Sequence, residues 1–295
     1  MTLQQLRQVL TIAESNSMNE AAKKLFVSQP NLSATVREVE EELGITVFMR
    51  NNRGITVTAE GEEFLGYAKQ VVEQYHLLEN RYLNVESKKK FSVSMQHYSF
   101  AVKAFVQLAK EVGMDEYEFA VHETKTKEVI DNVKNLKSEI GVLYLSDFNE
   151  KVLRKLFKEC DIEFKELFTC NTYVYLWKKH PLAGQKEITL DDLQEYPCLT
   201  FEQGVNNSFY YAEEMMSTYE YKRVIKADDR ATMLNLMVGL NGFTLCSGII
   251  SEDLNGDDYA AIPLKESEKM HIGYIKHKGT KLSKLGEIYI DALKN

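Results

Sequence analysis

Apolar positions in the first 44 residues recur every three or four residues, a pattern that predicts three short helices. The first helix is marked by an apolar stripe at Leu3, Leu6, Val9, Leu10 and Ala13. The second helix spans SMNEAAKKLF and ends near Phe26. Its start is typical of a capping box, because Ser17 is followed three residues later by Glu20 and each side chain can satisfy a free backbone amide.

The third helix follows in SQPNLSATVREVEEELG, with Ser28 as its N-cap, Pro30 in its first turn and Gly44 at its end. Two stripes run along this helix, two residues out of phase with each other. The buried stripe is expected to comprise Leu32, Val36, Val39 and Leu43. The outward stripe is expected to comprise Pro30, Ala34, Arg37 and Glu41.

Two short β-prone runs come next, in ITVFMRNNRGITVT, and they flank the turn-rich tip NNRG. They predict a β-hairpin, or wing. Arg50 and Arg53 would lie on or beside it, within reach of phosphates or the minor groove. Residues 1–58 therefore read as a winged helix-turn-helix, in which the N-terminal part of the third helix enters the major groove of DNA.

The charges of the third helix fit that orientation. From Ser28 to Arg37 there is no acidic residue, and the polar groups for base and phosphate contacts are Gln29, Asn31, Ser33 and Arg37. The positive end of the helix dipole lies at the same end. Glu38, Glu40, Glu41 and Glu42 follow, so EVEEELG is expected to be a solvated tail and stop. Only Glu41 shares the outward stripe with Arg37.

A longer helix is predicted from Phe64 onward. Its apolar positions step by four and three residues through Ala68, Val71, Tyr75, Leu78, Tyr82 and Val85. A narrow seam of this period with polar flanks is typical of a coiled coil, and we expect it to pair two copies of the chain. The alternative is a helix that packs on its own domain. ESKKKF breaks the pattern and marks the next boundary.

Beyond residue 90, short strands alternate with helices, which predicts an α/β region with parallel sheets. Ligands bind such sheets at the carboxyl ends of the strands, beside the amides of helix N-termini. The polar candidates at those ends are Gln96, His97, Tyr98, Ser99, Thr124, Thr126, Thr200, Gln203, Asn206, Asp229 and Arg230. The alternative is that these side chains cap their own helices, and for His97 a structural role is open beside a ligand-contacting one.

Composition and charge narrow the function class. A chain of 295 residues with 44% hydrophobic residues can form two or three domains. The net charge is −8, whereas residues 1–58 carry six basic and six acidic residues and so balance to zero. Unspecific adhesion to nucleic acid or membranes is therefore not expected, and DNA contact must come from a local basic patch.

Compartment and redox state follow from two further features. Polar residues interrupt every apolar run near the N-terminus, so we expect neither a signal peptide nor a membrane span, and a cytoplasmic protein. Cys160, Cys170, Cys198 and Cys246 are widely spaced and are expected to be reduced thiols.

No enzyme signature is found. The six histidines show no metal-ligand spacing, and Cys246 has no evident basic partner. Phosphate-binding, dinucleotide-binding and nucleophile-elbow motifs are absent from the sequence. We therefore expect no catalysis, no metal and no cofactor.

Residues 17–61, SMNEAAKKLFVSQPNLSATVREVEEELGITVFMRNNRGITVTAEG, resemble the DNA-binding signature of LysR-type transcriptional regulators. The matching residues are Ala21, Ala22, Leu25, Ser28, Gln29, Pro30, Leu32, Ser33, Glu40, Leu43, Gly44, Phe48, Arg50, Arg53, Thr58 and Gly61. With the docking geometry above, the residues expected to contact DNA are Ser28, Gln29, Pro30, Asn31, Ser33, Ala34, Arg37, Arg50 and Arg53. The alternative is a three-helix packing unit without a DNA role.

The remaining chain resembles the effector-binding region of that family, two subdomains of periplasmic-binding-protein type joined by two crossover strands. The resemblance places subdomain I at about 91–163 and 267–295 and subdomain II at about 164–266, with the effector in the cleft between them. SMQHYSF, SEIGVLYL, FEQG, DDRATM and CSG more narrowly resemble a Gram-positive branch that governs methionine and cysteine uptake or synthesis. Tyr144 and Ser247, in these segments, join the candidates. Ser247 and Gly248 depart from a Leu-Pro pair common in the family.

We therefore expect three parts: a DNA-binding domain at 1–58, a linker helix at 59–90 that dimerises through Ala68, Val71, Tyr75, Leu78 and Tyr82, and an effector-binding domain at 91–295. The expected function is metabolite-switched transcription regulation on a partly palindromic operator. The effector implied is an O-acylated serine or homoserine, or a related sulphur amino-acid metabolite. The resemblance implies a homotetramer and leaves RNA polymerase as a further partner. The competing hypothesis is a cytoplasmic solute-receptor-type protein without a DNA role.

Overall fold

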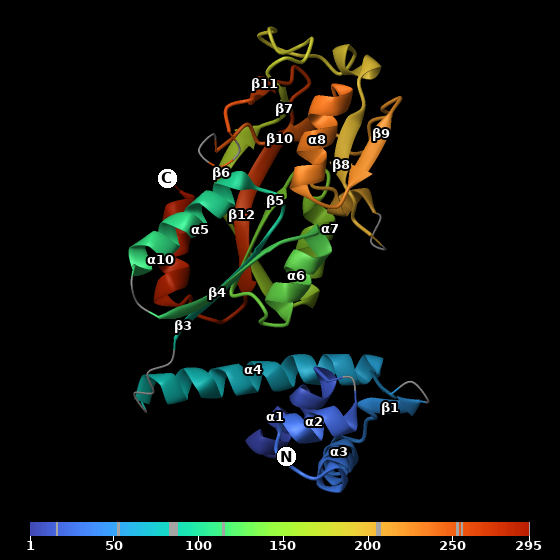
Figure 1. Cartoon of the computed structure of the whole chain (residues 1–295), viewed down its shortest axis with the longest axis vertical. Coiled ribbons are helices and arrows are strands. Elements are labelled where there is room, and N and C mark those ends of the chain that lie inside the picture. The colour runs from blue at the N-terminus through green and yellow to red at the C-terminus, as the bar shows by residue number, and fades with distance from the viewer. Residues whose placement is uncertain are drawn as a thin grey trace. The chain divides into compact units, whose positions relative to one another are not determined.

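The computed structural model describes residues 1–15, 17–51, 54–82, 88–113, 116–204, 208–251, 254 and 256–294. The side chains of Arg50 and Tyr82 and the whole of Arg53, Val85 and Asn206, all named above, lie outside this description. The chain divides into two compact units, Met1–Ser87 and Lys88–Asn295, each with its own core (Figure 1). Within the described ranges, none of the helices combines the length and apolar character needed to span a bilayer.

The first unit holds four helices and a hairpin. They are α1 (Leu3–Ala13), α2 (Met18–Lys24), α3 (Gln29–Leu43), β1 (Phe48–Asn51), β2 (Gly54–Val57) and α4 (Ala59–Tyr82). β1 and β2 pair antiparallel, with Phe48 opposite Val57. The predicted three helices and wing are confirmed in order and approximate length.

The start signals of these helices are local, as the sequence suggests. Ser17 accepts a hydrogen bond from the Glu20 amide at 3.2 Å, and Ser28 accepts one from the Asn31 amide at 3.4 Å. A reciprocal capping box, which the sequence reading did not locate, joins Thr2 and Gln5 at the start of α1. It fixes the first turn of α1 by satisfying two free amides.

The buried face of α3 is shorter than expected. Leu32, Val36 and Val39 are buried in the core of the unit, together with Val9 and Ile12 of α1. Leu43 is 38% exposed, so its assignment to the buried stripe was wrong. It is the last residue of α3, next to the left-handed Gly44 (φ 69°), and lies beyond that core.

The acidic end of α3 is exposed at Glu38, Glu41 and Glu42, as expected of a solvated tail, whereas the half-buried Glu40 departs from that expectation. Glu40 accepts hydrogen bonds from the amides of Val47 at 2.7 Å and Phe48 at 3.0 Å. Glu38 accepts from the Gln5 side chain, and Glu42 pairs with the N-terminal amine. These carboxylates attach the end of α3 to the wing and to the chain start.

Gly61, in the first turn of α4, lies where a residue with a side chain would clash with the backbone of Val47. A Cβ atom at this position would lie 2.3 Å from the Val47 carbonyl oxygen. The Gly61 amide donates to the Thr58 hydroxyl, which in turn donates to the Thr46 carbonyl. The approach of α4 to the β1 edge therefore depends on the absence of a side chain.

The residues of the predicted dimerisation seam in α4 do not share one environment, because one of them is buried within its own unit and others are exposed. Ala68 is 2% exposed and packs with Leu6 and Val72, so the own-domain alternative holds for Ala68 and it cannot reach a partner helix. Val71, Tyr75 and Leu78 are exposed, at 51%, 39% and 56%. Tyr67 on the same helix is also exposed. Ala68 departs because α1 covers the side of α4 that it occupies.

The second unit is built on a five-stranded sheet of order β4-β3-β5-β12-β6. The strands are β3 (Lys89–Met95), β4 (Tyr117–Glu123), β5 (Ile140–Leu145), β6 (Ile162–Asn171) and β12 (Lys269–His277). β3 runs parallel to β4 and β5, as expected, whereas β12 is antiparallel to β5 and β6.

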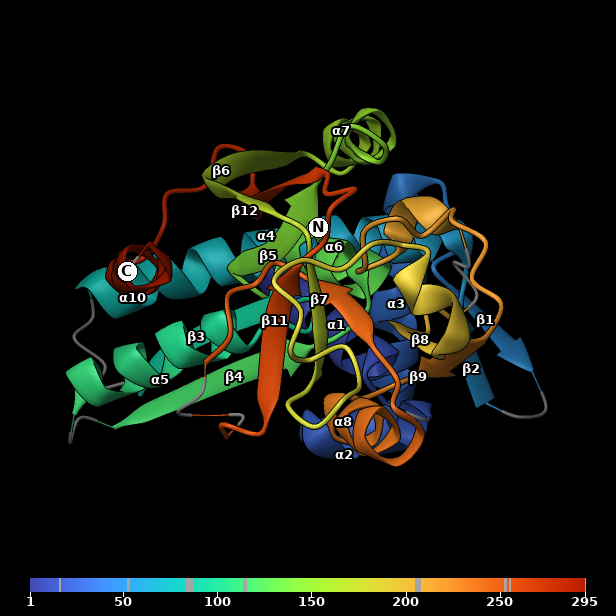
Figure 2. The same cartoon turned by 90° about the horizontal axis from the view of Figure 1, so that it is seen from above.

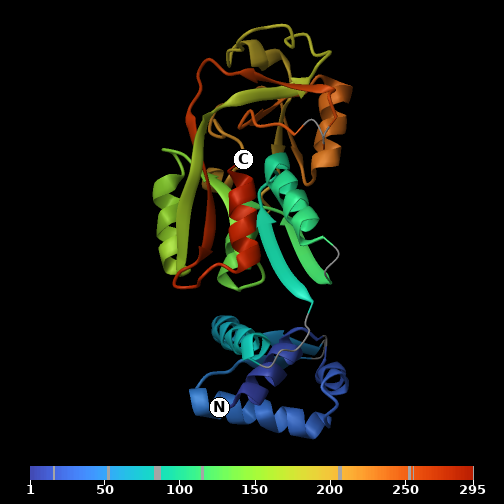
Figure 3. The same cartoon turned by 90° about the vertical axis from the view of Figure 1, so that its left-hand side faces the viewer.

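Helices cover both faces of this sheet, so its central strand β5 is buried along its whole length. They are α5 (Ser99–Val112), α6 (Thr126–Lys134), α7 (Glu150–Glu159) and α10 (Lys284–Leu293). α5 and α10 pack beside each other on one face, and α6 and α7 cover the other (Figures 2 and 3).

The rest of the unit contains a three-stranded sheet of order β10-β7-β11 and the parallel pair β8-β9. Its elements are β7 (Tyr173–Trp177), η1 (Asp192–Glu195), β8 (Cys198–Phe201), η2 (Phe209–Tyr211), β9 (Val224–Ala227), α8 (Arg230–Leu240), β10 (Thr244–Cys246) and β11 (Tyr259–Pro263). We call the five-stranded part subdomain I and this part subdomain II. The chain crosses between them from β6 to β7 and from β11 to β12, so the expected boundary at 163/164 falls inside β6.

Candidate functional site

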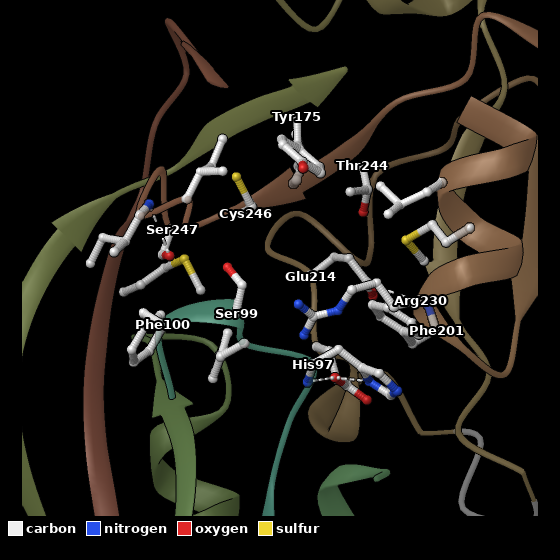
Figure 4. Close-up of a pocket in the computed structure, with 18 residues that line it drawn as sticks. His97, Ser99, Phe100, Tyr175, Phe201, Glu214, Arg230, Thr244, Cys246 and Ser247 are labelled. Atoms are coloured by element: carbon white, nitrogen blue, oxygen red, sulfur yellow. Dashed lines mark hydrogen bonds and ion pairs between the residues drawn. The ribbon is translucent and has the colours of Figure 1, made fainter. Parts of the chain in front are cut away.

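A pocket of about 90 Å³ lies between the two subdomains of residues 88–295. Subdomain I lines it with the turn after β3 and the start of α5, and subdomain II with α8, β10 and the acidic segment after η2 (Figure 4). The lining is mainly apolar, including Tyr175, Met233, Leu234, Ile249, Ile250 and Met270. A mainly apolar concave space with a few convergent polar groups is the usual form of a small-molecule site.

Five of the thirteen predicted effector residues line this pocket. They are His97, Tyr98, Ser99, Arg230 and Ser247. In Figure 4 the hydroxyls of Ser99 and Thr244 face the middle of the pocket from opposite sides, and the guanidinium of Arg230 reaches into it. The carboxyl end of β3 and the N-terminus of α8 thus meet, as expected for an α/β ligand site.

Four other predicted residues lie behind the pocket wall and do not line it. Gln96, Thr126, Tyr144 and Gln203 are all buried. The Gln96 amide donates to the Thr126 hydroxyl at 2.5 Å, and its oxygen accepts from the Tyr144 amide at 3.1 Å. Gln203 accepts from the Thr126 amide at 3.2 Å. Because buried polar groups must be paired, these side chains satisfy one another, Gln96 within subdomain I and Gln203 across to Thr126 of subdomain I.

Thr124, Thr200 and Asp229, the remaining predicted residues that the structure describes, do not line the pocket either. Asp229 is the N-cap of α8, and hydrogen bonds from Thr232 hold the pKa of its carboxyl below the ordinary range. Thr124 donates to Glu128 at the start of α6, and Thr200 lies in β8 outside the lining. The capping alternative is therefore correct for Asp229.

His97 is engaged at the floor of the pocket. Its backbone amide and its ring Nδ1 both lie within hydrogen-bonding distance of Glu213 Oε2, at 2.9 and 2.8 Å. The ring stacks on Phe201, with centroids 3.6 Å apart. The Gln203 amide donates to the other oxygen of Glu213 at 2.9 Å. A carboxylate of subdomain II thus fixes the turn that follows β3 of subdomain I.

Glu214 is the second buried acid in the pocket, with 4% of its surface exposed. Its Oε1 accepts a hydrogen bond from the Phe201 amide at 2.8 Å. Burial, and then the neighbouring Glu213 carboxylate, raises the pKa of Glu214 to about 8. Glu214 therefore holds a proton at neutral pH in the unliganded pocket and can donate a hydrogen bond.

The sequence reading missed both acids. They stand in YYAEEMM, where aromatic residues precede the pair and methionines follow it. A pair of adjacent acids inside an apolar run without helical or strand periodicity is the signal that was available. Such a pair is normally exposed, and it becomes informative because its flanks require burial.

Arg230 brings a cation to the same pocket. Its guanidinium pairs with Glu123, the last residue of β4. Nearby, Lys125 pairs with Asp228 at 3.2 Å. Both ion pairs join subdomain I to subdomain II, and both are partly exposed.

The predicted DNA-reading surface lies in the other unit, on the first half of α3. Ser28, Pro30, Asn31, Ala34 and Arg37 are exposed along it. Gln29 and Ser33 are half-buried, and the Gln29 amide lies 2.7 Å from the Ser33 hydroxyl. Arg53 and the side chain of Arg50 lie outside the described residues. That these residues contact DNA stays a prediction.

Comparison with known proteins decides the family. Residues 3–62 match the bacterial regulatory helix-turn-helix protein, lysR family, and residues 114–295 match the LysR substrate binding domain. The chain belongs to the LysR family. It is a DNA-binding transcriptional regulator with an effector-binding domain, and the confirmed winged helix and two-subdomain region are the parts that this family combines.

Individual LysR relatives agree over the full length. The chain is 25% identical to the HTH-type transcriptional regulator CysL of Bacillus subtilis, over 98% of this chain and 96% of that protein. A full-length OxyR variant from Pseudomonas aeruginosa has a similar fold, with a TM-score of 0.72, 19% identity and coverage of 100% and 95%. CbnR in complex with its target DNA has a TM-score of 0.59, 17% identity and coverage of 100% and 99%.

The departure at Ser247 and Gly248 has a structural explanation in this LysR-family chain. Gly248 has φ +74°, and a Cβ atom there would lie 2.5 Å from the Tyr173 ring. The Gly248 amide lies 3.3 Å from the Cys246 sulphur. The backbone therefore turns tightly against Tyr173, and this turn holds Ser247 in the pocket wall.

The thiol that lines the pocket is protonated. All four cysteines are free, and burial raises the pKa of Cys246 to about 12, so its thiol stays protonated at neutral pH. Among the described residues, no group of three or more His, Cys, Asp and Glu side chains could hold a metal ion.

Proposed function

We propose that this LysR-family protein is a cytoplasmic transcription regulator switched by a small amino-acid-like metabolite, a sulphur amino-acid precursor or derivative such as an O-acylated serine or homoserine. The observation that carries this proposal is the pocket between the subdomains, where Arg230 and two buried acids share one small apolar space. The Arg230 cation can hold a carboxylate, and the Glu213 carboxylate and the acceptor oxygen of protonated Glu214 can accept hydrogen bonds from an amino group, so the pocket suits a small amino-acid-like ligand.

The rest of the lining supports a short ligand. Ser99, Thr244 and Ser247 supply hydroxyls, and the methionine and isoleucine side chains suit a short apolar or thioether tail. A volume of about 90 Å³ limits the effector to a small molecule. The resemblance of SMQHYSF, FEQG and CSG to regulators of sulphur amino-acid genes favours the same class.

The switch follows from the position of the pocket. A ligand between two subdomains changes their relation if it binds one arrangement more tightly than the other. In a dimer, this change would alter the spacing or angle of two α3 helices, which reach successive major-groove turns about 34 Å apart on a partly palindromic operator. The exposed residues Tyr67, Val71, Tyr75 and Leu78 of α4 supply an apolar surface for that dimer. Tetramers and contact with RNA polymerase remain part of the proposal.

The function is tested with the full-length protein in two assays. A gel shift with DNA upstream of its own gene or the neighbouring gene should show a salt-sensitive, sequence-selective complex. Thermal-shift screening should find stabilisation by O-acetyl-L-serine, O-acetyl-L-homoserine or a related compound, because a ligand of the native state raises the melting temperature. A selective metabolite effect without any DNA complex would support the solute-receptor alternative instead. Stabilisation by none of the sulphur amino-acid precursors would reject this effector class.

The dimer surface is tested separately. Leu78→Asp should lower the mass of the complex in sedimentation experiments, because a charge would enter an apolar interface. Gln74→Asp, on the same exposed helix, is the matched control and should have a much smaller effect. An unchanged mass for Leu78→Asp would remove Leu78 from the interface.

A further inference from the structure

We infer that the effector of this regulator carries a carboxylate that takes Arg230 away from Glu123, so that binding exchanges an ion pair between the subdomains for one between protein and ligand. The inference rests on the proposed function for the existence of an effector. The inference goes beyond the proposed function in naming the ion pair between Arg230 and Glu123 as the contact that the carboxylate of the effector breaks.

The exchange follows from where the two partners lie. Arg230 is the first residue of α8 in subdomain II, and Glu123 is the last residue of β4 in subdomain I. Arg230 lines the pocket, whereas Glu123 does not. Figure 4 shows the guanidinium reaching toward the space that Ser99 and Thr244 face. A ligand in the pocket can therefore meet Arg230 without entering the site of Glu123.

The other charged groups around Arg230 already have partners. Glu213 is held by His97 and Gln203. Glu214 accepts from the Phe201 amide, and Asp229 accepts from Thr232. Arg230 supplies the only guanidinium or ammonium among the described residues that line the pocket. Its ion-pair partner is Glu123, and this is the contact that a ligand anion would compete with.

A second observation points to a missing acceptor in the same space. The hydroxyl of Thr244 is buried, with 5% of the residue exposed, and has no hydrogen-bond partner among the described residues. It faces the pocket in Figure 4. Buried polar groups without a partner are rare in folded proteins, and a ligand carboxylate would supply an acceptor.

The strengths of the two ion pairs favour the exchange. The side chains of Arg230 and Glu123 are 21% and 29% exposed, so solvent weakens their attraction, and Glu123 can be hydrated after release. A ligand carboxylate inside the apolar pocket is better shielded and can bind the guanidinium with two parallel hydrogen bonds. Other cross-links survive, including Lys125 with Asp228 and the Tyr144 hydroxyl with the Ala212 carbonyl. The subdomains would therefore shift rather than separate.

The test uses a simple carboxylate, sodium acetate, in thermal-shift titrations of the full-length protein at constant ionic strength set with sodium chloride. Glu123→Gln removes the competing anion and should tighten acetate binding about threefold, the range expected for loss of a partly exposed ion pair. Arg230→Gln should abolish the acetate-dependent shift. Asp228→Asn is the matched control, because it breaks the neighbouring cross-subdomain pair without touching the pocket, and should leave acetate affinity unchanged.

Each outcome decides the inference. Tightening in Glu123→Gln with loss in Arg230→Gln supports it. Equal acetate affinity in the native protein and Glu123→Gln overturns it, as does an equal gain in Asp228→Asn or the absence of any acetate-dependent shift. The ligand-free melting temperature and circular dichroism spectrum of each variant show whether its effector-binding unit is folded.

A second set of titrations separates this inference from the proposed effector class, using O-acetyl-L-serine and its methyl ester. If the acid but not the ester binds, and Glu123→Gln tightens the acid, both proposals are supported. If acetate behaves as expected and O-acetyl-L-serine does not bind, the carboxylate exchange stands and the effector class is rejected. If acid and ester bind the native protein equally, the effector class stands and the exchange is overturned.

Discussion

The carboxylates of Glu40 and Glu213 each accept hydrogen bonds from backbone amides, but in different surroundings. Glu40, near the end of α3, is half-buried and accepts from two amides at the start of the wing, seven and eight residues away along the chain. Glu213 is buried and accepts from His97, 116 residues away. The first contact joins neighbouring elements of one small unit, and the second joins the two subdomains of the other.

The acidic residues next to Glu40 and Glu213 in the sequence also differ in their exposure to solvent. Glu38 and Glu42 bond partners at the surface, where water competes. Glu214 is buried away from solvent, and this burial raises its pKa to about 8. Acidic side chains thus connect separate segments in both units, but only Glu213 and Glu214 line a pocket, and only Glu214 has a pKa raised by burial.

The largest expected effect concerns Glu214. Its pKa in the folded chain is above the ordinary value of 4.5, so the native state holds a proton that the unfolded chain releases. The resulting stability is fully present below about pH 4.5 and is lost as pH rises through about 8, a loss of about 5 kcal/mol in this group's contribution. Urea unfolding of residues 88–295 within the intact protein, measured from pH 5 to 9, should show this slope. Glu214→Gln should remove it, and Glu202→Gln, a partly exposed position of the same subdomain, should retain it.

Glu213→Ala should have the next largest effect. It leaves the His97 amide, the His97 ring and the Gln203 amide without their acceptor inside the protein. We expect the effector-binding unit to lose about 3 kcal/mol of unfolding free energy and its ligand-dependent melting shift. Glu213→Gln, which keeps an acceptor oxygen, should lose less. A fall below 1 kcal/mol for the alanine variant would show that this buried contact does not join the subdomains as described.

Glu40→Ala should destabilise the DNA-binding unit by about 2 kcal/mol, because the amides of Val47 and Phe48 lose a charged acceptor. Operator affinity should fall with it, while the melting shift produced by an effector remains. Glu41→Ala, at the next and exposed position of α3, is the control and should stay near the native stability. Equal losses in both variants would mean that helix charge, and not the amide contact, is what matters.

Glu42→Gln should have the smallest effect, below about 1 kcal/mol, since its pair with the N-terminal amine is largely exposed. Raising the salt concentration should reduce the difference between this variant and the native protein further. Thermal unfolding at low and high salt checks both expectations. A loss as large as that of Glu40→Ala would contradict the distinction between the surface contacts.

The first unit was predictable because its determinants are local. Ser28, Gly44 and the stripe through Leu32, Val36 and Val39 each follow from spacing within one helix, and all were found as expected. The prediction that Leu43 is buried was wrong because the spacing of apolar residues does not show where the core ends. The prediction that Ala68 contacts a second copy was wrong because a seam of period 3.5 does not show which of its residues pack against α1 of the same chain.

The pocket was predictable only in part, because it is assembled from distant segments. The turn after β3 and the start of α8 were recognised from the rule that ligands lie at strand ends. Gln96 and Gln203 were chosen by the same rule, but their side chains satisfy other buried groups. Glu213 and Glu214 have no such marker, since their role depends on Phe201 and His97, which only the fold brings close.

The division of α3 has a consequence for engineering. The carboxylate that contacts the wing belongs to Glu40, whereas the exposed positions Asn31, Ala34 and Arg37 have no part in the core of the unit. Randomising those three positions should therefore alter operator preference while leaving the melting temperature nearly unchanged. Variants that bind new DNA sequences could therefore be selected from a library at these three positions of α3, without changes to the residues that stabilise the unit.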